Sequence, residues 1–128
     1  MFDLGKLREI KHFAFDLQLA IKNFGGYQSY LSALDRFTRN AVHYLRAYTP
    51  VVVIHSADIH KQFLNDVGIV RRDLVQLGMM AFASELGYLE KYATNDHPKL
   101  LEDALRKFHA DMEIVAAHIN NARLPLID

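Results

Sequence analysis

The clearest pattern of hydrophobic and polar positions lies toward the C-terminal end of the sequence. Apolar residues recur there in alternating steps of four and three, the spacing of one buried stripe on an α-helix. The stripe consists of Leu101, Leu105, Phe108, Met112, Val115 and Ile119. A polar stretch from Asn95 to His97 followed by Pro98 is typical of a helix start, and Pro125 disfavours helix at the residue before it. The pattern predicts a helix from Pro98 to Asn120.

The preceding segment shows the same alternation over a greater length. Its stripe consists of Phe63, Val67, Val70, Leu74, Leu77 and Ala81 and continues through Phe82, Leu86, Leu89 and Ala93. Gly78 and Gly87 fall inside this pattern, and each weakens a helix by about 1 kcal/mol relative to alanine, which tertiary packing can offset. We therefore predict one long helix that follows a turn at residues 56–58 and ends near Thr94.

A third long helix is predicted upstream, after a turn at Gly25 and Gly26. Its apolar positions are Tyr30, Leu31, Leu34, Phe37, Ala41, Tyr44, Leu45 and Tyr48. Thr49-Pro50 is either a kink or a new helix start, because proline disfavours the helical conformation of the residue before it.

The N-terminal region supplies a shorter element. Leu7, Ile10 and Phe13 indicate a first helix, and residues 15–24 either continue it or form another. Together the segments predict an all-α fold, an up-down four-helix bundle with a short additional N-terminal helix. We expect residues 1–128 to form a single domain.

Composition narrows the function classes. Fifteen basic and fifteen acidic residues balance, so the chain lacks the positive charge of nucleic-acid-binding proteins. Cysteine is absent, which excludes disulfides, thiol catalysis and thiolate metal sites. The N-terminal segment carries charges every few residues and resembles neither a signal peptide nor a membrane span. We expect a cytoplasmic protein with neither nucleic acid nor membrane among its partners.

Three segments share their residue pattern with one family of signalling domains. Residues 16–37 combine an acidic-apolar start, a short helix, a Phe-Gly-Gly turn and a Tyr-Leu pair that leads to a phenylalanine. Residues 58–78 contain an aromatic position at Phe63 and end on Leu-Gly, and residues 89–119 contain Leu-Glu, an Asp-containing turn and an apolar helix. These segments resemble the histidine phosphotransfer (Hpt) domain, which carries phosphoryl groups between receiver domains in two-component phosphorelays. The likeness spans residues 16–119 and implies a helical bundle.

The resemblance breaks at the centre of the family's motif. Hpt domains have a phosphoacceptor histidine ten residues before the glycine that matches Gly78, and a lysine three residues after that histidine. These positions hold Gly68 and Arg71 here. Phosphotransfer needs an imidazole nitrogen as nucleophile, and glycine has no side chain. The resemblance therefore implies no catalysis at position 68, although Arg71 keeps the positive charge of the lysine.

Helical spacing groups several residues opposite the buried stripe of the predicted long helix. This face consists of Gly68, Arg71, Arg72, Val75 and Met79. This face would have no side chain at its centre, with positive charge and exposed apolar area around it. A receiver domain presents an acidic pocket ringed by apolar residues, so its surface would complement this face. We expect a non-catalytic, monomeric Hpt-like module without a cofactor. Through this face it would bind a receiver domain or a histidine kinase and regulate or scaffold a phosphorelay.

Two other interpretations stay open. The chain could be an active phosphotransfer protein that uses His60 or His43, since His60 lies near the start of the same helix and His43 with Arg46 repeats the family's spacing. It could instead be a helical adaptor or dimerisation module unrelated to phosphorelays, with Val75 and Met79 in the dimer interface.

No metal site is predicted. The inward Glu-x-x-His motif of di-iron bundles is absent, and His55 and His60 are five residues apart, a spacing that does not put both on one helical face. His109 and Glu113 share a helical face, but such a pair is common on helix surfaces.

Overall fold

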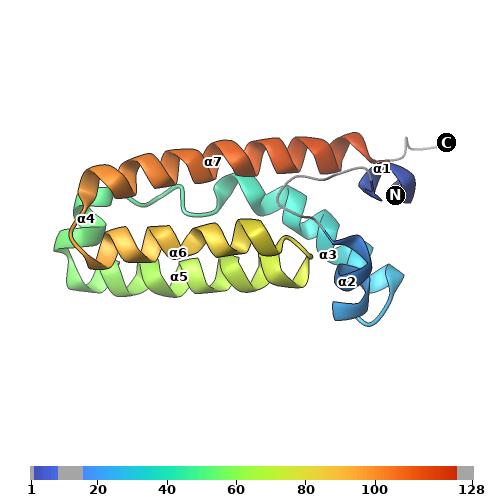
Figure 1. The fold of residues 1–128 in the computed structure, drawn as a ribbon, viewed down its shortest axis with the longest axis horizontal. Coiled ribbons are helices and arrows are strands. Elements are labelled where there is room, and N and C mark those ends of the chain that lie inside the picture. The colour runs from blue at the N-terminus through green and yellow to red at the C-terminus, as the bar shows by residue number, and fades with distance from the viewer. Residues whose placement is uncertain (1, 9–15, 124–128) are drawn as a thin grey trace.

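The computed structural model describes residues 2–8 and 16–123, and these residues are mostly helical (Figure 1). The elements are α1 (Leu4–Arg8), α2 (Leu17–Asn23), α3 (Tyr27–Asn40), the 3₁₀ helix η2 (Ala41–His43), α4 (Pro50–His55), α5 (Ala57–Gln76), α6 (Met80–Thr94) and α7 (Pro98–Asn121). The described residues form no strand, and one isolated antiparallel bridge joins Phe2 to Arg123. The predicted all-α class is therefore confirmed for this part of the chain.

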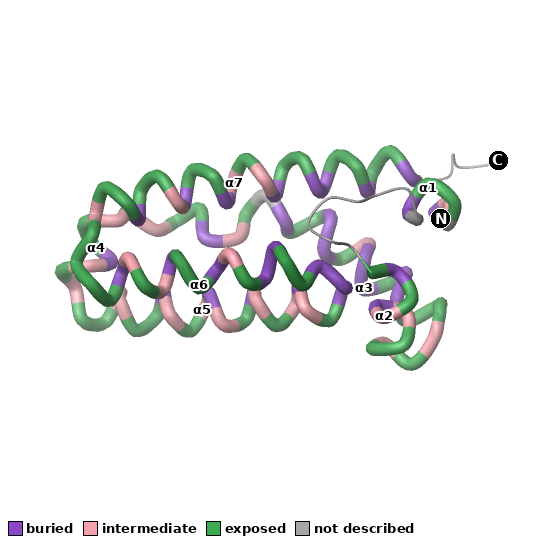
Figure 2. Tube along the Cα trace, in the orientation of Figure 1, coloured by how far each residue is buried: buried purple, intermediate pink, exposed green. Residues whose placement is uncertain are grey.

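Three long helices define the shape of the molecule. α5 and α6 run antiparallel, side by side, and α7 lies along the opposite side of the structure (Figure 1). α4 closes one end, while α1 and α2 lie at the other. Buried positions face the space between these helices (Figure 2), so the apolar stripes meet in one core.

The predicted C-terminal helix is confirmed. α7 begins at Pro98, and its bounds differ from the prediction by one residue. All six residues of its predicted stripe are buried.

The predicted long helix from residue 58 to residue 94 is wrong, because the chain reverses between α5 and α6. Gly78 has φ +81°, a left-handed conformation that glycine adopts without the steric cost of a Cβ. A Cβ at this position would lie 2.2 Å from the carbonyl oxygen of Asp16, and the Asp16 N–H donates a 2.8 Å hydrogen bond to the Gly78 carbonyl. The turn also changes the phase of the stripe, so Ala81, which was predicted to be buried, is exposed.

The predicted helix through Tyr48 is also wrong, because α3 ends at Asn40 and the chain continues through η2 into non-helical residues 44–49. Tyr44 follows η2 with an extended backbone, ψ 126°, and Leu45 comes next with φ +60° and a buried side chain. Pro50 then starts α4, which confirms a new helix start at this point. Of the turn predicted at residues 56–58, only Ser56 lies outside the helices: its Oγ caps α5 by accepting from the Ile59 N–H at 3.4 Å, and α5 already begins at Ala57.

The N-terminal predictions are tested only in part. Leu7 is buried in α1, whereas Ile10, Phe13 and Phe15 lie outside the described residues. α2 has its own N-cap, since the Asp16 carboxylate accepts a 3.0 Å hydrogen bond from the Leu19 N–H. Among the helices that the structure describes, none has the length and apolar character needed to cross a bilayer.

The reversal at Gly78 generates a stability prediction. We expect Gly78→Ala to lower the free energy of unfolding by at least about 2 kcal/mol, because it adds a left-handed backbone penalty to a clash with Asp16. Urea denaturation measures this change. Gly87→Ala is the matched control: Gly87 lies inside α6 with no atom within 4 Å of an added Cβ, so alanine there should stabilise by up to about 1 kcal/mol. An unchanged midpoint for Gly78→Ala would contradict the geometry of the turn.

A second prediction concerns the buried Tyr30 hydroxyl, which has no hydrogen-bond partner among the described residues. Burial raises the pKa of this phenol above its usual value. The folded state therefore keeps a proton that the unfolded chain loses near pH 10, so this tyrosine's contribution to stability is present below pH 10 and falls as the pH rises further, by about 1.4 kcal/mol per pH unit.

We expect Tyr30→Phe to raise stability at neutral pH by roughly 1 kcal/mol, because it removes an unsatisfied polar atom, and to flatten the alkaline loss. Denaturant titrations at pH 7 and above pH 10 test both effects, with Tyr88→Phe, at an exposed ring, as the control. A loss of stability at neutral pH in Tyr30→Phe would show that the hydroxyl has a partner.

Candidate functional site

Gly68, the centre of the predicted docking face, lies in the middle of α5 and is half-buried. A Cβ built on it would meet no heavy atom within 4 Å outside its own helix. The space over Gly68 is therefore open, and a side chain at this position would extend away from the core.

The two arginines of the predicted face have different surroundings. Arg71 Nη2 lies 2.6 Å from Glu90 Oε1 on α6, and each of these side chains is 35 % exposed. Arg71 therefore links α5 to α6, and its charge is partly neutralised. Arg72 is exposed and forms no ion pair with the described residues, so it is the more available cation.

The apolar part of the predicted face is corrected by the structure. Met79 is buried, with 1 % exposure, because the turn at Gly78 directs it into the core at the start of α6. Val75 is half-buried and packs against the core. Met79 therefore provides no exposed apolar surface, and Val75 provides only part of its own.

Ile69 replaces them as the exposed apolar residue beside Gly68, with 42 % exposure. Sequence analysis missed it, although Ile69 lies out of phase with the buried stripe and so was visible in the pattern. Together with Lys61, Asn65, Gly68 and Arg72 it forms a surface that we name the α5 outer face. Between residues 60 and 76 the exposed positions of α5 include Lys61 and Arg72 but no Asp or Glu. This face is therefore positive on a chain with no net charge.

The inner side of α5 fixes this face in place. The Tyr48 hydroxyl donates to Asp66, the Tyr44 hydroxyl donates to Asp73 at 3.4 Å, and the Tyr48 ring stacks on Phe63 with centroids 5.0 Å apart. Burial, with a smaller contribution from the neighbouring carboxylate, raises the pKa of both phenols. Both hydroxyls therefore stay protonated as donors, and they hold the non-helical segment 44–49 against α5.

The two histidines considered as alternative phosphoacceptors differ in exposure. His60 is half-buried, with its Nδ1 3.2 Å from the Val53 carbonyl oxygen. His43 is exposed in η2, beside an open groove that also contains Arg46 and Glu113. Arg46 Nη2 is held 2.6 Å from Glu113 Oε1, so it does not act freely as the lysine equivalent of His43.

His109 lies in a partly buried environment. Its Nε2 is buried without a hydrogen-bond partner among the described residues. Burial, and then the charge of Arg46, lowers the pKa of its imidazole, while backbone hydrogen bonds with Tyr44 and Leu45 act in the opposite direction. It therefore stays neutral more readily than an exposed histidine.

The described residues contain no group of side chains suited to a metal ion. Within the described ranges, no three His, Asp or Glu side chains are close enough together to hold a metal ion. The carboxylate of Glu113 is engaged by Arg46.

The α5 outer face is thus the candidate site, with an open centre, two exposed cations and one exposed isoleucine. Comparison of the chain with protein-family models, with curated proteins and with solved structures gives no match.

Proposed function

We propose that this chain is a non-catalytic, Hpt-like signalling module that binds a receiver domain or a histidine kinase through the α5 outer face. In this proposal the α3–α4 segment, α5, α6 and α7 act as the members of an up-down four-helix bundle, and α1 is the additional N-terminal helix. The observation that supports it most is the open space over Gly68, at the position where the family's motif has its nucleophile.

The electrostatics of the face support an acidic partner. Lys61 and Arg72 are exposed on α5, and no exposed carboxylate between residues 60 and 76 offsets them. A receiver domain presents an acidic pocket with apolar residues around it, so Arg72 would meet the carboxylates and Ile69 the apolar rim. Such charge complementarity mainly raises the association rate and selects among partners.

The absence of a side chain at position 68 defines the mechanism that we propose. The partner's phosphoryl group would find no imidazole to accept it, so the complex would form without transfer. The chain would then compete with an active phosphotransfer protein for the same receiver, or hold a receiver and a kinase together. Either effect regulates a phosphorelay without catalysis.

The first prediction tests docking with a charge reversal. We expect titration calorimetry against the receiver domains of the host to detect binding, and Arg72→Glu to weaken it by about 1 to 3 kcal/mol, or roughly 5-fold to 150-fold. Lys22→Glu makes the same change of charge on α2, away from the face, and should leave the affinity unchanged. We prefer Arg72 to Arg71 here, because Arg71→Glu would also break the pair with Glu90.

Two results would count against docking at this face. Binding that Arg72→Glu does not change would place the interface elsewhere. A lack of binding to any receiver domain or histidine kinase of the host would remove the proposed function.

The second prediction restores the missing nucleophile. A Cβ at position 68 meets no heavy atom within 4 Å outside its own helix, so Gly68→His adds its side chain without a clash at the first atom. We expect this variant to gain acid-labile phosphate when incubated with a phosphorylated receiver domain, while the unaltered chain gains none. Gly87→His is the matched control, since Gly87 is also helical, exposed and open but lies on α6.

The label also distinguishes the alternatives. Label on the unaltered chain would favour an active phosphotransfer protein, and its loss in His60→Gln or His43→Gln would identify the residue. Equal labelling of Gly68→His and Gly87→His would show that the α5 outer face is not special.

A further inference from the structure

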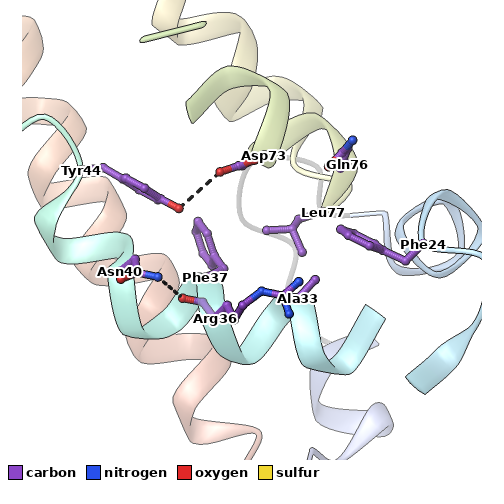
Figure 3. A pocket seen from close by; sticks show the side chains of 9 residues that line it. All are labelled: Phe24, Ala33, Arg36, Phe37, Asn40, Tyr44, Asp73, Gln76 and Leu77. Atoms are coloured by element: carbon purple, nitrogen blue, oxygen red, sulfur yellow. Dashed lines mark hydrogen bonds between the residues drawn. The ribbon is translucent and has the colours of Figure 1, made fainter. Parts of the chain in front are cut away.

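A cavity of about 260 Å³ lies between α3 and the C-terminal turn of α5, with Phe24 from the end of α2 at its side (Figure 3). It is separate from the α5 outer face. Rings from Phe24 and Phe37 and the side chain of Leu77 form its apolar surface. The Asn23 side-chain amide donates to the Gln76 carbonyl at 3.2 Å, and this bond joins α2 to α5 at the edge of the cavity.

Two opposite charges line this cavity from different walls. Arg36 comes from α3 and Asp73 from α5, with Phe37 and Leu77 between them in Figure 3. Arg36 forms no ion pair with the described residues, so its guanidinium is available to an anion. The turn that carries it is fixed, because Asn40 Nδ2 donates to the Arg36 carbonyl at 2.9 Å.

Asp73 has spare hydrogen-bonding capacity. Its Oδ2 accepts from the Tyr44 hydroxyl at 3.4 Å, which is long for an O–H···O bond. Its Oδ1 has no partner among the described residues. A carboxylate can accept several hydrogen bonds, so Asp73 can take a donor from a ligand.

We propose that this cavity binds a small aromatic carboxylate that carries a hydrogen-bond donor at its far end. The carboxylate would pair with Arg36, the ring would pack on Phe24 and Phe37, and the donor would reach Asp73. Forked pairing with a guanidinium suits a planar carboxylate.

Size and charge select this class of ligand. The volume is slightly below the range of about 300–1,000 Å³ for drug-sized ligands, so one ring and its substituents fit better than a nucleotide. Asp73 lies in the same cavity as Arg36 and would repel a dianion such as a phosphate monoester. A ligand with one negative charge at one end and a hydrogen-bond donor at the other would complement Arg36 on one wall and Asp73 on the other.

The test is a titration of the ¹⁵N-labelled chain, followed by amide chemical shifts, with three probes. 4-Hydroxybenzoate has both groups, benzoate lacks the donor, and 4-hydroxybenzyl alcohol lacks the carboxylate. We expect saturable shifts from 4-hydroxybenzoate at residues of α3 and the end of α5, and binding about tenfold weaker for 4-hydroxybenzyl alcohol, the effect of one charge-assisted hydrogen bond. Benzoate should bind more weakly than 4-hydroxybenzoate.

Variants of Arg36 and Asp73 test which residue binds each end of the ligand. Arg36→Gln should weaken 4-hydroxybenzoate about tenfold and leave 4-hydroxybenzyl alcohol unchanged, since only the former has the charged group. Asp73→Asn should reduce the preference for 4-hydroxybenzoate over benzoate. Arg39→Gln is the matched control on α3, because Arg39 is paired with Asp35 and lies outside the cavity, and it should change nothing.

The result that overturns the proposal is equally specific. Shifts that do not saturate at millimolar 4-hydroxybenzoate, or an affinity that Arg36→Gln leaves unchanged, would show that the cavity does not bind this class. Ala33→Leu fills the cavity from its α3 wall and should abolish binding; thermal unfolding of each variant checks that the fold is kept.

Discussion

The contact between Asp16 and Gly78 is the constraint on which the rest of the structure depends. The backbone of Asp16 donates to the Gly78 carbonyl, and its own carbonyl occupies the space that any Cβ at position 78 would need. This contact sets the start of α2 against the turn between α5 and α6. Because the chain reverses at this turn, α5 and α6 are antiparallel. The turn also buries Met79 and places Leu77 in the wall of the cavity. A single glycine therefore lies at the junction of α5, which carries the proposed docking face, and the proposed ligand site.

The sequence predicted the elements whose ends are encoded locally. α7 has a proline at its start, and its stripe is unbroken, while Ser56 caps α5 within one turn. The break at Gly78 was missed, because the apolar spacing continues across it from Leu77 to Phe82 and periodicity outweighed the glycine as a stop signal. The break itself is local: Gly78 is left-handed, its N–H donates to the Val75 carbonyl and the Met79 N–H donates to the Leu74 carbonyl, the usual capping pattern of a glycine at a helix end, and Asp16 packs against this turn. The end of α3 at Asn40 was missed as well, since the apolar spacing continues through η2 and the non-helical residues 44–49 and predicts a helix there.

The candidate site was predicted in part for the same reason. Gly68, Arg71 and Arg72 lie before the turn, so helical phase placed them correctly on α5. Met79 lies after the turn, where that phase no longer applies, and it is buried. The ion pair of Arg71 with Glu90 depends on the antiparallel packing of α6, so periodicity gave no sign of it. Half-exposed pairs of this kind add little stability.

The inner and outer sides of α5 therefore differ in their residues and in what they contact. Its inner carboxylates, Asp66 and Asp73, hold segment 44–49 through tyrosine hydroxyls, and its outer face has cations, one isoleucine and an open glycine. The measurement that tests this division most directly is the footprint of a receiver domain on the ¹⁵N-labelled chain, read from amide signals that broaden or shift in the complex. The account predicts that the affected amides gather along the α5 outer face, from Lys61 to Arg72. A footprint confined to α7, or to the cavity beside α3, would contradict it.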